Sequence, residues 1–138
     1  MMLKVKLDEG AKRPVRANAG DAGLDLYARE TKTIPPRGIE VFDTGVHMEI
    51  PFGYCGMIIS KSGLMCKQGI TSDGLVDSGY TGSIAVALIN HSDKEYTVQE
   101  GDKISQIVIA PCSMAWTIET DEISGGERGD NGFGSSGR

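Results

Sequence analysis

The sequence lacks several features that would place it in a common functional class. It has no run of about 18 apolar residues, the length that a membrane-spanning helix needs, so we expect no membrane partner. Positive charge is in deficit, because 14 Lys plus Arg face 19 Asp plus Glu, for a formal net charge of −5. Binding along a nucleic acid polymer depends on surplus Lys and Arg. The charge balance therefore argues against a DNA or RNA polymer as partner.

Cysteine is also scarce. The three cysteines, Cys55, Cys66 and Cys112, are an odd number without a CxxC pair, which disfavours a disulfide framework or a structural zinc site. We interpret them as reduced thiols, and for Cys66 we favour packing over redox regulation. The N-terminal segment MMLKVKLDEG has no apolar core of the kind found in signal peptides, so we expect a cytoplasmic protein.

Helical periodicity is rare as well. No glycine-free window of about eleven residues carries apolar side chains at i, i+3, i+4 and i+7. Instead, 19 of 138 residues are glycine, and turn signals separate short apolar stretches that are typical of strands. The predicted strands are residues 3–7, 46–50, 57–59, 84–89 and 107–110, with one helical turn near residues 62–67. This layout predicts an all-β protein with a jelly-roll-like β-barrel.

The composition changes near residue 119. Residues 1–118 carry the strand signals, whereas residues 119–138 contain only Ile123 and Phe133 as large apolar side chains. Such a segment cannot bury enough surface to order itself. A disordered terminus is one interpretation. The other is a flexible Gly-rich lid, because Arg128 and Phe133 stand among glycines and hydroxyls whose backbone N–H groups can surround phosphate oxygens. We predict a barrel core followed by this lid.

Two common nucleotide-binding motifs can be rejected. Residues 132–137 match G-x-G-x-x-G, but only Arg138 follows, so there is no helix whose N-terminus could receive a pyrophosphate. Lys61 and Ser62 match the end of a P-loop, yet Cys55 and Ser60 occupy the positions of its two glycines.

Five segments, taken in order, resemble the motifs of the trimeric dUTPase family. They are AGDAGLDLYA, PFGYCGMIISKSGL, GLVDSGYTGSIAVALIN, GDKISQIVI and RGDNGFGSSG, which together span residues 19–137. Each alone has an ordinary explanation as a loop, a helix cap or a hairpin, and their joint order carries the resemblance. It implies a jelly-roll homotrimer that hydrolyses dUTP to dUMP and pyrophosphate with Mg²⁺. That activity keeps uracil out of DNA and supplies dUMP for dTTP synthesis.

The third segment holds the implied centre of the reaction. Asp77 matches the carboxylate that orients the water attacking the α-phosphorus, and an ionised carboxylate can accept a proton from such a water. Tyr80 would lie under the deoxyribose and exclude a 2′-hydroxyl. The backbone of a hairpin from about Gly74 to Val86, near Ala85, would read the uracil. Backbone readout discriminates because a wrong base leaves buried groups unpaired, at about 1–3 kcal/mol each.

The second and fourth segments carry the implied phosphate ligands of the barrel core, which are Lys61, Ser62, Gly63 and Gln106. Asp25, in the first segment, would orient metal-bound water or neighbouring cations, an indirect link to the metal. Mg²⁺ keeps several waters and relies on substrate phosphates, so a dense carboxylate cluster is not required.

The fifth segment carries the implied ligands of the lid. Arg128 would pair with the γ-phosphate and Phe133 would stack on the uracil, worth about 1–3 kcal/mol by analogy with base–aromatic contacts. Gly134, Ser135 and Ser136 would add backbone and hydroxyl donors. In the family, the tail of one chain reaches a site built by the other two.

Three positions depart from the usual family pattern. Lys61 stands in place of an arginine, Asn131 in place of a glycine and Ser136 in place of a threonine. A lysine cannot form the planar fork of a guanidinium, so either phosphate alignment is looser or another group compensates.

Three alternatives remain at this stage. A dCTP deaminase shares the implied fold, but residues 84–90, IAVALIN, lack the carboxylate that such an enzyme carries there. A nucleotide-responsive binding protein on the same scaffold is the second. A catalytically silent jelly roll is the third, and the joint presence of Asp77, Tyr80, Arg128 and Phe133 argues against it.

Overall fold

The computed structural model describes residues 1–137 and consists of short strands with one helix. The elements are β1 Lys4–Leu7, β2 Leu24–Tyr27, β3 Lys32–Ile34, β4 Ile39–Asp43, β5 Val46–Glu49, β6 Tyr54–Ile59, η1 Leu64–Gln68, β7 Ile70–Thr71, β8 Asp73–Val76, β9 Ala85–Asn90, β10 Tyr96–Val98 and β11 Lys103–Pro111. The all-β prediction is confirmed. Among the described residues, no helix is long and apolar enough to cross a membrane.

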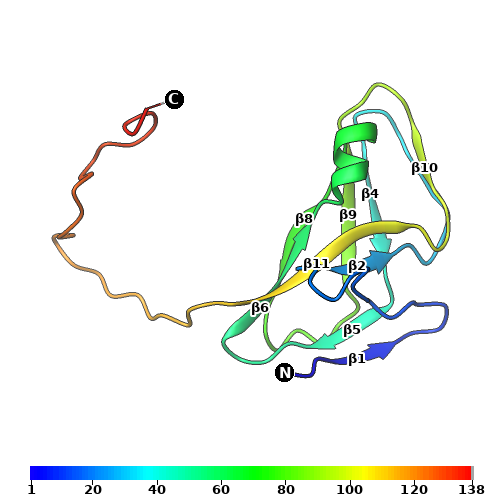
Figure 1. Cartoon of the computed structure of the whole chain (residues 1–138), viewed down its shortest axis with the longest axis horizontal. Helices are drawn as coiled ribbons and strands as arrows, with labels where there is room; N and C mark the ends of the chain where they lie inside the picture. Colours follow the sequence, from blue (N-terminus) through cyan, green and yellow to red (C-terminus); the bar gives the residue numbers. More distant parts are fainter. Residues whose placement is uncertain (138) are drawn as a thin grey trace.

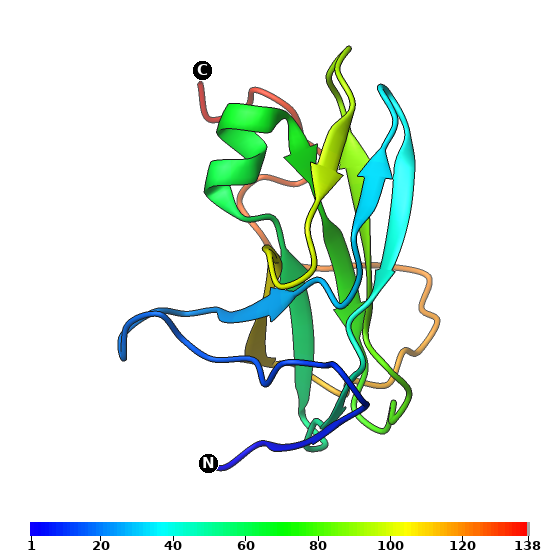
Figure 2. The same cartoon turned by 90° about the vertical axis from the view of Figure 1, so that its right-hand side faces the viewer.

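The strands form four antiparallel sheets around one core (Figures 1 and 2). The largest has the order β2-β11-β6-β8, and the second has the order β4-β9-β7. Two ribbons, β1-β5 and β10-β3, complete the body. The long strand β11 pairs with β2 on one side and with β6 on the other, so it ties distant parts of the chain together.

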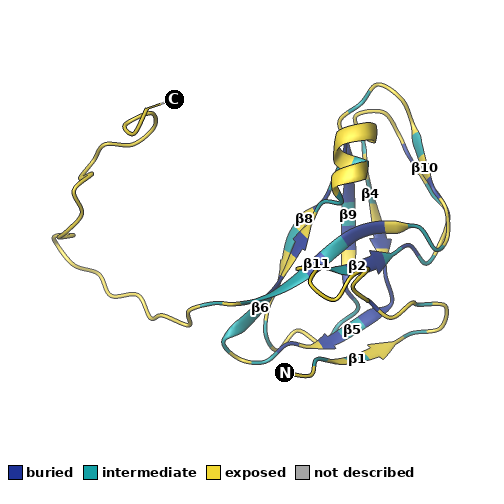
Figure 3. Ribbon diagram, in the orientation of Figure 1, coloured by how far each residue is buried: buried dark blue, intermediate teal, exposed yellow. Residues whose placement is uncertain are grey.

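The core consists of the inward-facing residues of both main sheets. In β9, Val86 and Leu88 point inward with Asn90, while the residues between them are only partly buried. Phe42 from β4 and Leu26 from β2 are fully buried against them. Alternate strand residues face opposite sides, which explains this pattern. Burying each large apolar side chain stabilises the fold by about 1.5–3 kcal/mol, and Figure 3 shows the burial concentrated in these strands.

The five predicted strands are present within a few residues of their expected bounds, as β1, β5, β6, β9 and β11. The predicted helical turn is present as η1, a short helix that ends at Gln68 and is capped by Gly69. Gly69 has φ 68°, a left-handed conformation that glycine adopts without the clash of a Cβ. Of the other strands, β8 falls in the expected hairpin segment, whereas β2, β3, β4, β7 and β10 were not among the five, and runs such as KTI and YTV are too short for a periodicity.

The C-terminal tail leaves the body just after β11. The backbone N–H of Cys112 donates to the carbonyl of Gly53 (2.9 Å), and residues 113–137 are all exposed. The tail runs away from the body in Figure 1 and is exposed throughout in Figure 3. We placed the boundary between core and lid at residue 118, and residues 113–118 are exposed, including Trp116, which is 97% exposed. Residue 138, the end of the predicted lid, lies outside the described residues.

Candidate active site

Strands β8 and β9 diverge at the segment where a hairpin was expected. They belong to different sheets, and residues 77–84 connect them. Within residues 1–137, β8 pairs only with β6, and β7 covers only the Ile89–Asn90 end of β9. The residues from Gly74 to Val86 therefore do not form one paired ladder. Facing backbone edges that lack strand partners can hydrogen-bond a ligand instead.

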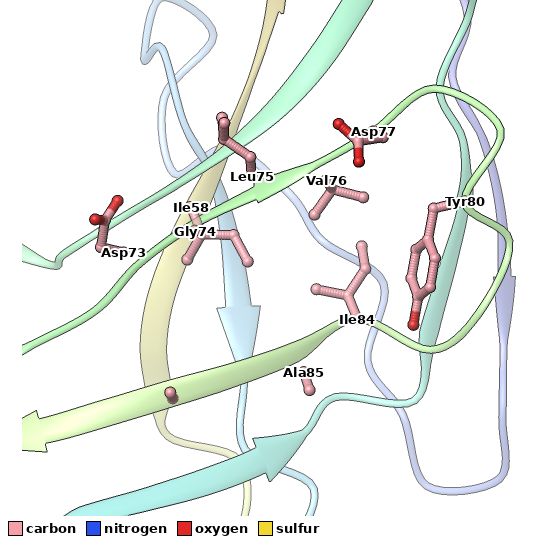
Figure 4. Close-up of a pocket in the computed structure, with 10 residues that line it drawn as sticks. Ile58, Asp73, Gly74, Leu75, Val76, Asp77, Tyr80, Ile84 and Ala85 are labelled. Atoms are coloured by element: carbon pink, nitrogen blue, oxygen red, sulfur yellow. The ribbon is translucent and has the colours of Figure 1, made fainter.

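A cavity of about 320 Å³ lies between these two strands (Figure 4). It is lined by Ile58, Asp73, Gly74, Leu75, Val76, Asp77, Tyr80, Ile84, Ala85 and Ala87. Asp77 and Asp73 lie at opposite ends of it, and the Tyr80 ring lies near Ile84. The volume is at the lower end for small-molecule sites, so it suits a nucleoside and leaves a polyphosphate chain outside. Four residues expected at the site, Gly74, Asp77, Tyr80 and Ala85, thus line one cavity.

The loop between β8 and β9 holds Tyr80 in place. The backbone N–H of Tyr80 donates to the carbonyl of Asp77 (3.2 Å), which closes a tight turn directly after β8. The phenol Oη donates to the carbonyl of Ser83 (2.9 Å). Gly82 lies against the ring, because a Cβ at this position would be 2.6 Å from the Cζ atom of Tyr80. Tyr80 is 48% exposed, so its own loop holds the side chain while much of the residue stays open to solvent.

A second group of expected site residues gathers around Asp25 on β2. Asp25 is only 3% exposed, and its carboxylate accepts a hydrogen bond from Lys61 Nζ at 2.6 Å and forms an ion pair with Lys103 Nζ at 3.1 Å. Burial raises the pKa of Asp25, but the hydrogen bonds and charges of the two lysines outweigh burial and hold it below its ordinary value. Asp25 is therefore ionised at neutral pH and anchors both cations.

Lys103 is the residue that the sequence analysis missed. The hydrogen bond from Lys103 to Asp25 and the charge of Asp25 raise the pKa of Lys103, so the lysine stays protonated. Two ammonium groups around one carboxylate leave a net charge of about +1, whereas Lys61 and Asp25 alone would be neutral. The sequence signal that could have identified Lys103 is its place in the fourth segment, GDKISQIVI, three residues before Gln106.

Gln106 lies beside this charged group. It is opposite Asp25 in the β2–β11 register, and its Nε2 donates to the carbonyl of Ser60 (3.1 Å). Gly23 faces its side chain so closely that a Cβ there would lie 3.0 Å from the Gln106 Cβ. Gln106 is thus positioned by contacts on two sides. Its bond to Ser60 places it next to the residue that precedes Lys61.

Ser62 and Gly63 form the start of the helical turn and are both exposed. The turn is closed by the backbone N–H of Met65, which donates to the carbonyl of Lys61 at 2.9 Å. The expected phosphate ligands Lys61, Ser62 and Gly63 thus directly precede η1, the helix at one end of the body in Figure 2, and Gln106 contacts Ser60 beside them. This end is opposite the N-terminus.

The structure does not bring the tail residues to either group. Among residues 1–137, Arg128 bonds only to other tail residues, donating to the carbonyls of Asn131 (3.1 Å) and Gly132 (3.2 Å). Phe133 is fully exposed, and Gly134, Ser135 and Ser136 are exposed as well.

The cavity and the Asp25 group are also separate within the chain. Among residues 1–137, no hydrogen bond or ion pair joins Gly74, Asp77, Tyr80 or Ala85 to Asp25, Lys61, Lys103 or Gln106. None of the Asp25 group lines the cavity. One chain therefore presents three parts of a site that do not meet.

The carboxylates of the described residues do not form a metal cage. No group of three or more His, Cys, Asp and Glu side chains is placed to hold a metal ion within residues 1–137. Both oxygens of Asp25 already face ammonium groups. Mg²⁺ commonly keeps several waters and binds through one or two carboxylates and substrate phosphates. This donor set fits an ion that enters with a polyphosphate ligand.

The outer face of the largest sheet is apolar. Met57 and Ile59 on β6 and Leu75 on β8 point away from the core, and Leu75 is 72% exposed. Met57 pairs with Leu75 on one side and with Val108 on the other, so these side chains form one patch. Contiguous exposed apolar patches mark interaction surfaces.

Comparison with known sequences finds one family over nearly the whole chain. The family profile described as dUTPase matches residues 9–137. The "Deoxyuridine 5'-triphosphate nucleotidohydrolase" of Tropheryma whipplei (strain Twist) is 44% identical over 136 residues, which cover 96% of this chain and 93% of the relative.

Solved structures with the same fold are also known. A Staphylococcus bacteriophage 80alpha dUTPase with dUPNHPP has a TM-score of 0.93 and 30% identity, covering 99% of both chains. It is one of the phage dUTPases described as controlling transfer of virulence genes by a proto-oncogenic G protein-like mechanism. A mutant dUTPase from phage phi11 of S. aureus, described with a structural Mg(II) ion, has a TM-score of 0.83 and 28% identity, covering 88% of this chain and 98% of that one.

Proposed function

Because this chain belongs to the dUTPase family, we propose that it hydrolyses dUTP to dUMP and pyrophosphate. The family match confirms, at the level of the family, the resemblance seen in the ordered sequence motifs. The observation that carries the proposal is the cavity between β8 and β9, because it gathers Asp77, Tyr80, Gly74 and Ala85 in one nucleoside-sized space. The phage structure with the dUTP analogue supports the same substrate.

In this proposal, the cavity binds the deoxyuridine. The facing backbone edges of β8 and β9 hydrogen-bond the uracil in place of a strand partner, near Gly74 and Ala85. Tyr80 packs on the deoxyribose, and its fixed ring leaves no space for a 2′-hydroxyl. Selectivity for deoxyuridine then follows from backbone donors and acceptors and from steric exclusion, with no need for a polar side chain that reads the base.

Asp77 performs the proton chemistry in this proposal. Its carboxylate, at the end of the cavity, accepts a hydrogen bond from a water and aims the oxygen of that water at the α-phosphorus. The new O–P bond forms as the bond from the α-phosphorus to the bridging oxygen breaks, and pyrophosphate leaves. The proton of the water passes to Asp77 and then to solvent. Mg²⁺, entering with the triphosphate, neutralises charge on the phosphate oxygens.

The Asp25 group supplies the phosphate-binding charge. Lys61 is held by Asp25, and Lys103 keeps the group net positive toward the phosphates. Lys103 then compensates for Lys61, which stands in place of the family's arginine. Gln106, Ser62 and the Gly63 backbone would complete the phosphate contacts.

The active assembly is a homotrimer in this proposal. The cavity, the Asp25 group and the tail are separate within one chain, so a complete site needs parts of several copies. The apolar patch of Met57, Ile59, Leu75 and Val108 gives a surface for association. The tail exposes Trp116, Ile118 and Phe133, which one chain alone leaves in solvent. Closed threefold symmetry would repeat the same composite site three times.

The direct test is hydrolysis of dUTP beside UTP, dTTP and dCTP, with Mg²⁺ and with a chelator. We expect pyrophosphate release from dUTP with Mg²⁺ and at least about a hundredfold lower kcat/KM for the other three nucleotides. Removal of the metal should strongly reduce turnover. A folded trimer that releases no pyrophosphate from dUTP would contradict the proposal, and ammonia release from dCTP would support the deaminase alternative.

Lys103→Met should raise the KM for dUTP by about tenfold, because the remaining Lys61–Asp25 pair carries no net charge toward the phosphates. The affinity for dUMP, which lacks the β- and γ-phosphates, should change much less. Lys103→Arg should restore most of the loss, and Lys94→Met, on the loop between β9 and β10, is the matched control. Equal losses for dUTP and dUMP would indicate a structural role only.

Tyr80→Ala should raise the ratio of kcat/KM for UTP to that for dUTP by about tenfold or more, because removing the ring opens space for a 2′-hydroxyl. Tyr80→Phe keeps the ring and loses only the bond to Ser83, so it should remain selective. Steady-state kinetics with both nucleotides measure the ratio. An unchanged ratio in Tyr80→Ala would mean that another group excludes the ribose.

A partner-binding role would be additional to hydrolysis. It corresponds to the nucleotide-responsive alternative raised by the sequence, and the phage relative is described as controlling transfer of virulence genes by a proto-oncogenic G protein-like mechanism. A pull-down whose captured proteins change when dUTP is added would support it for this chain.

A further inference from the structure

Two of the cysteines lie on the same face of the largest sheet. Cys55 on β6 pairs with Ala110 on β11, and the backbone N–H of Cys112 continues this ladder by donating to the carbonyl of Gly53 (2.9 Å). Residues two apart in a strand point to the same face. Cys112 therefore lies diagonally across from Cys55, and both thiols are partly buried.

The two thiols interact with each other. Burial raises the pKa of the Cys112 thiol, and the neighbouring Cys55 thiol and Asp77 carboxylate raise it further. Cys112 lies just past the end of β11, where the chain leaves the sheet. Diagonal neighbours in an antiparallel pair lie about 7–8 Å apart, so a disulfide, which needs a Cα separation of about 4.4–6.8 Å, requires the backbone to shift at this end of the sheet.

The same face leads directly to Asp77. Gly56 on β6 pairs with Val76 on β8, so the next pair along the two strands brings Cys55 opposite Asp77. Cys55 on β6 thus lies between two residues on the neighbouring strands: Cys112 just past the end of β11, and Asp77 just past the end of β8. Neither thiol lines the cavity, but both are only partly buried, so a small reagent has access to them in the single chain.

We propose that Cys55 and Cys112 form a reversible intramolecular disulfide that lowers the activity of the enzyme. The oxidant is a low-molecular-weight disulfide such as oxidised glutathione. One cysteine thiolate attacks it, forming a mixed disulfide and releasing one glutathione thiolate. The second cysteine thiolate then displaces the other glutathione. The protein loses two electrons and two protons overall, and the oxidant becomes two thiols.

The new bond would act on the reaction through Asp77. It draws Cys55 toward β11, and the carboxylate opposite Cys55 moves with β6 and β8. A misplacement of about 1 Å in a catalytic group can cost about a hundredfold in rate. Because the thiolate is the attacking species and the Cys112 pKa is raised, the exchange should become faster as pH rises above neutral.

The test uses full-length protein with Cys66→Ser, which removes the exposed third thiol. After treatment with oxidised glutathione, intact mass spectrometry should show a loss of two hydrogens, and peptide mapping should identify the Cys55–Cys112 link. Turnover of dUTP should fall by about tenfold or more and return with dithiothreitol. Cys55→Ser and Cys112→Ser, each with Cys66→Ser, should stay active after the same treatment.

The mass measurement does not depend on the proposed function, whereas the activity measurement rests on it. Reduced protein that does not hydrolyse dUTP would contradict the proposed function and leave the disulfide result standing. Stable glutathione adducts without the internal link would overturn the inference. A formed link with unchanged turnover would also overturn it, because the bond would then not act on Asp77.

Discussion

Asp77→Asn is expected to lower kcat for dUTP by about 10²- to 10⁴-fold while changing KM by less than about threefold. Asparagine has nearly the shape of aspartate, so the cavity between β8 and β9 should keep its form and still bind the nucleotide. The amide cannot take the proton of the attacking water. The loss should therefore appear in the chemical step and not in binding.

Two measurements separate these effects. Steady-state kinetics give kcat and KM, and calorimetry with dUpNHpp gives the affinity for a nucleotide that stays intact. Asp73→Asn is the matched control, because Asp73 lines the opposite end of the same cavity. It should retain kcat within about tenfold. An Asp77→Asn variant with wild-type kcat would remove Asp77 from the proposed proton transfer.

Removing residues 127–138 is expected to lower kcat/KM for dUTP by at least about 10³-fold. The deletion takes away Arg128, and an arginine that stabilises charge on a transferring phosphate can contribute about 10³–10⁵ in kcat. It also removes Phe133, whose stacking on the base would be worth about 1–3 kcal/mol. The body should keep its melting temperature, because residues 113–137 make no buried contacts.

A mixing experiment shows which chain each tail serves. The tail-deleted protein and the Asp77→Asn protein are each nearly inactive in their own trimers. After unfolding and refolding together, hybrid trimers should regain activity, because an intact Asp77 from one chain can meet the tail of another. Light scattering should show a trimer for each protein and for the mixture. Absence of recovery in confirmed hybrids would mean that each tail serves its own chain.

The two predicted losses have different origins, and each follows from where the groups lie. Asp77 is fixed by a turn directly after β8, so its substitution changes the chemistry and leaves the geometry in place. Arg128 and Phe133 lie in an exposed tail, and the proposed mechanism requires the tail to carry them to the nucleotide. Closure of a flexible segment can then assemble the phosphate contacts only when substrate is present. The lid remains a proposal that the deletion tests.

Much of the fold class was predictable from local patterns. The alternation in Val46 to Ile50 and the apolar run in Ile84 to Ile89 each specify a strand, because strand residues alternate faces with a period of two. Frequent glycines and turn residues disfavoured long helices. Strands β3 and β10 could not be predicted, because segments of three residues acquire strand geometry only by pairing with each other across the sheet.

The candidate site was predictable in part. The order of five motifs identified the family and with it Asp77, since motif order is a property of the chain alone. The pairing of Lys103 with Asp25 was not predictable, because the two residues are far apart in sequence and meet only through the β2–β11 ladder. The same holds for Cys55 and Cys112, which the β6–β11 ladder brings onto one face.

The amino-acid sequence by itself therefore determined the strand-rich fold, the family and the identity of the carboxylate proposed to react. Tertiary structure alone decided that β8 and β9 splay apart to leave a cavity, that a second lysine shares Asp25, and that the tail departs at Cys112. The physical reason is that side-chain periodicity and turn preferences act between neighbours in the chain. Strand register and charge clustering are fixed only when distant segments come into contact.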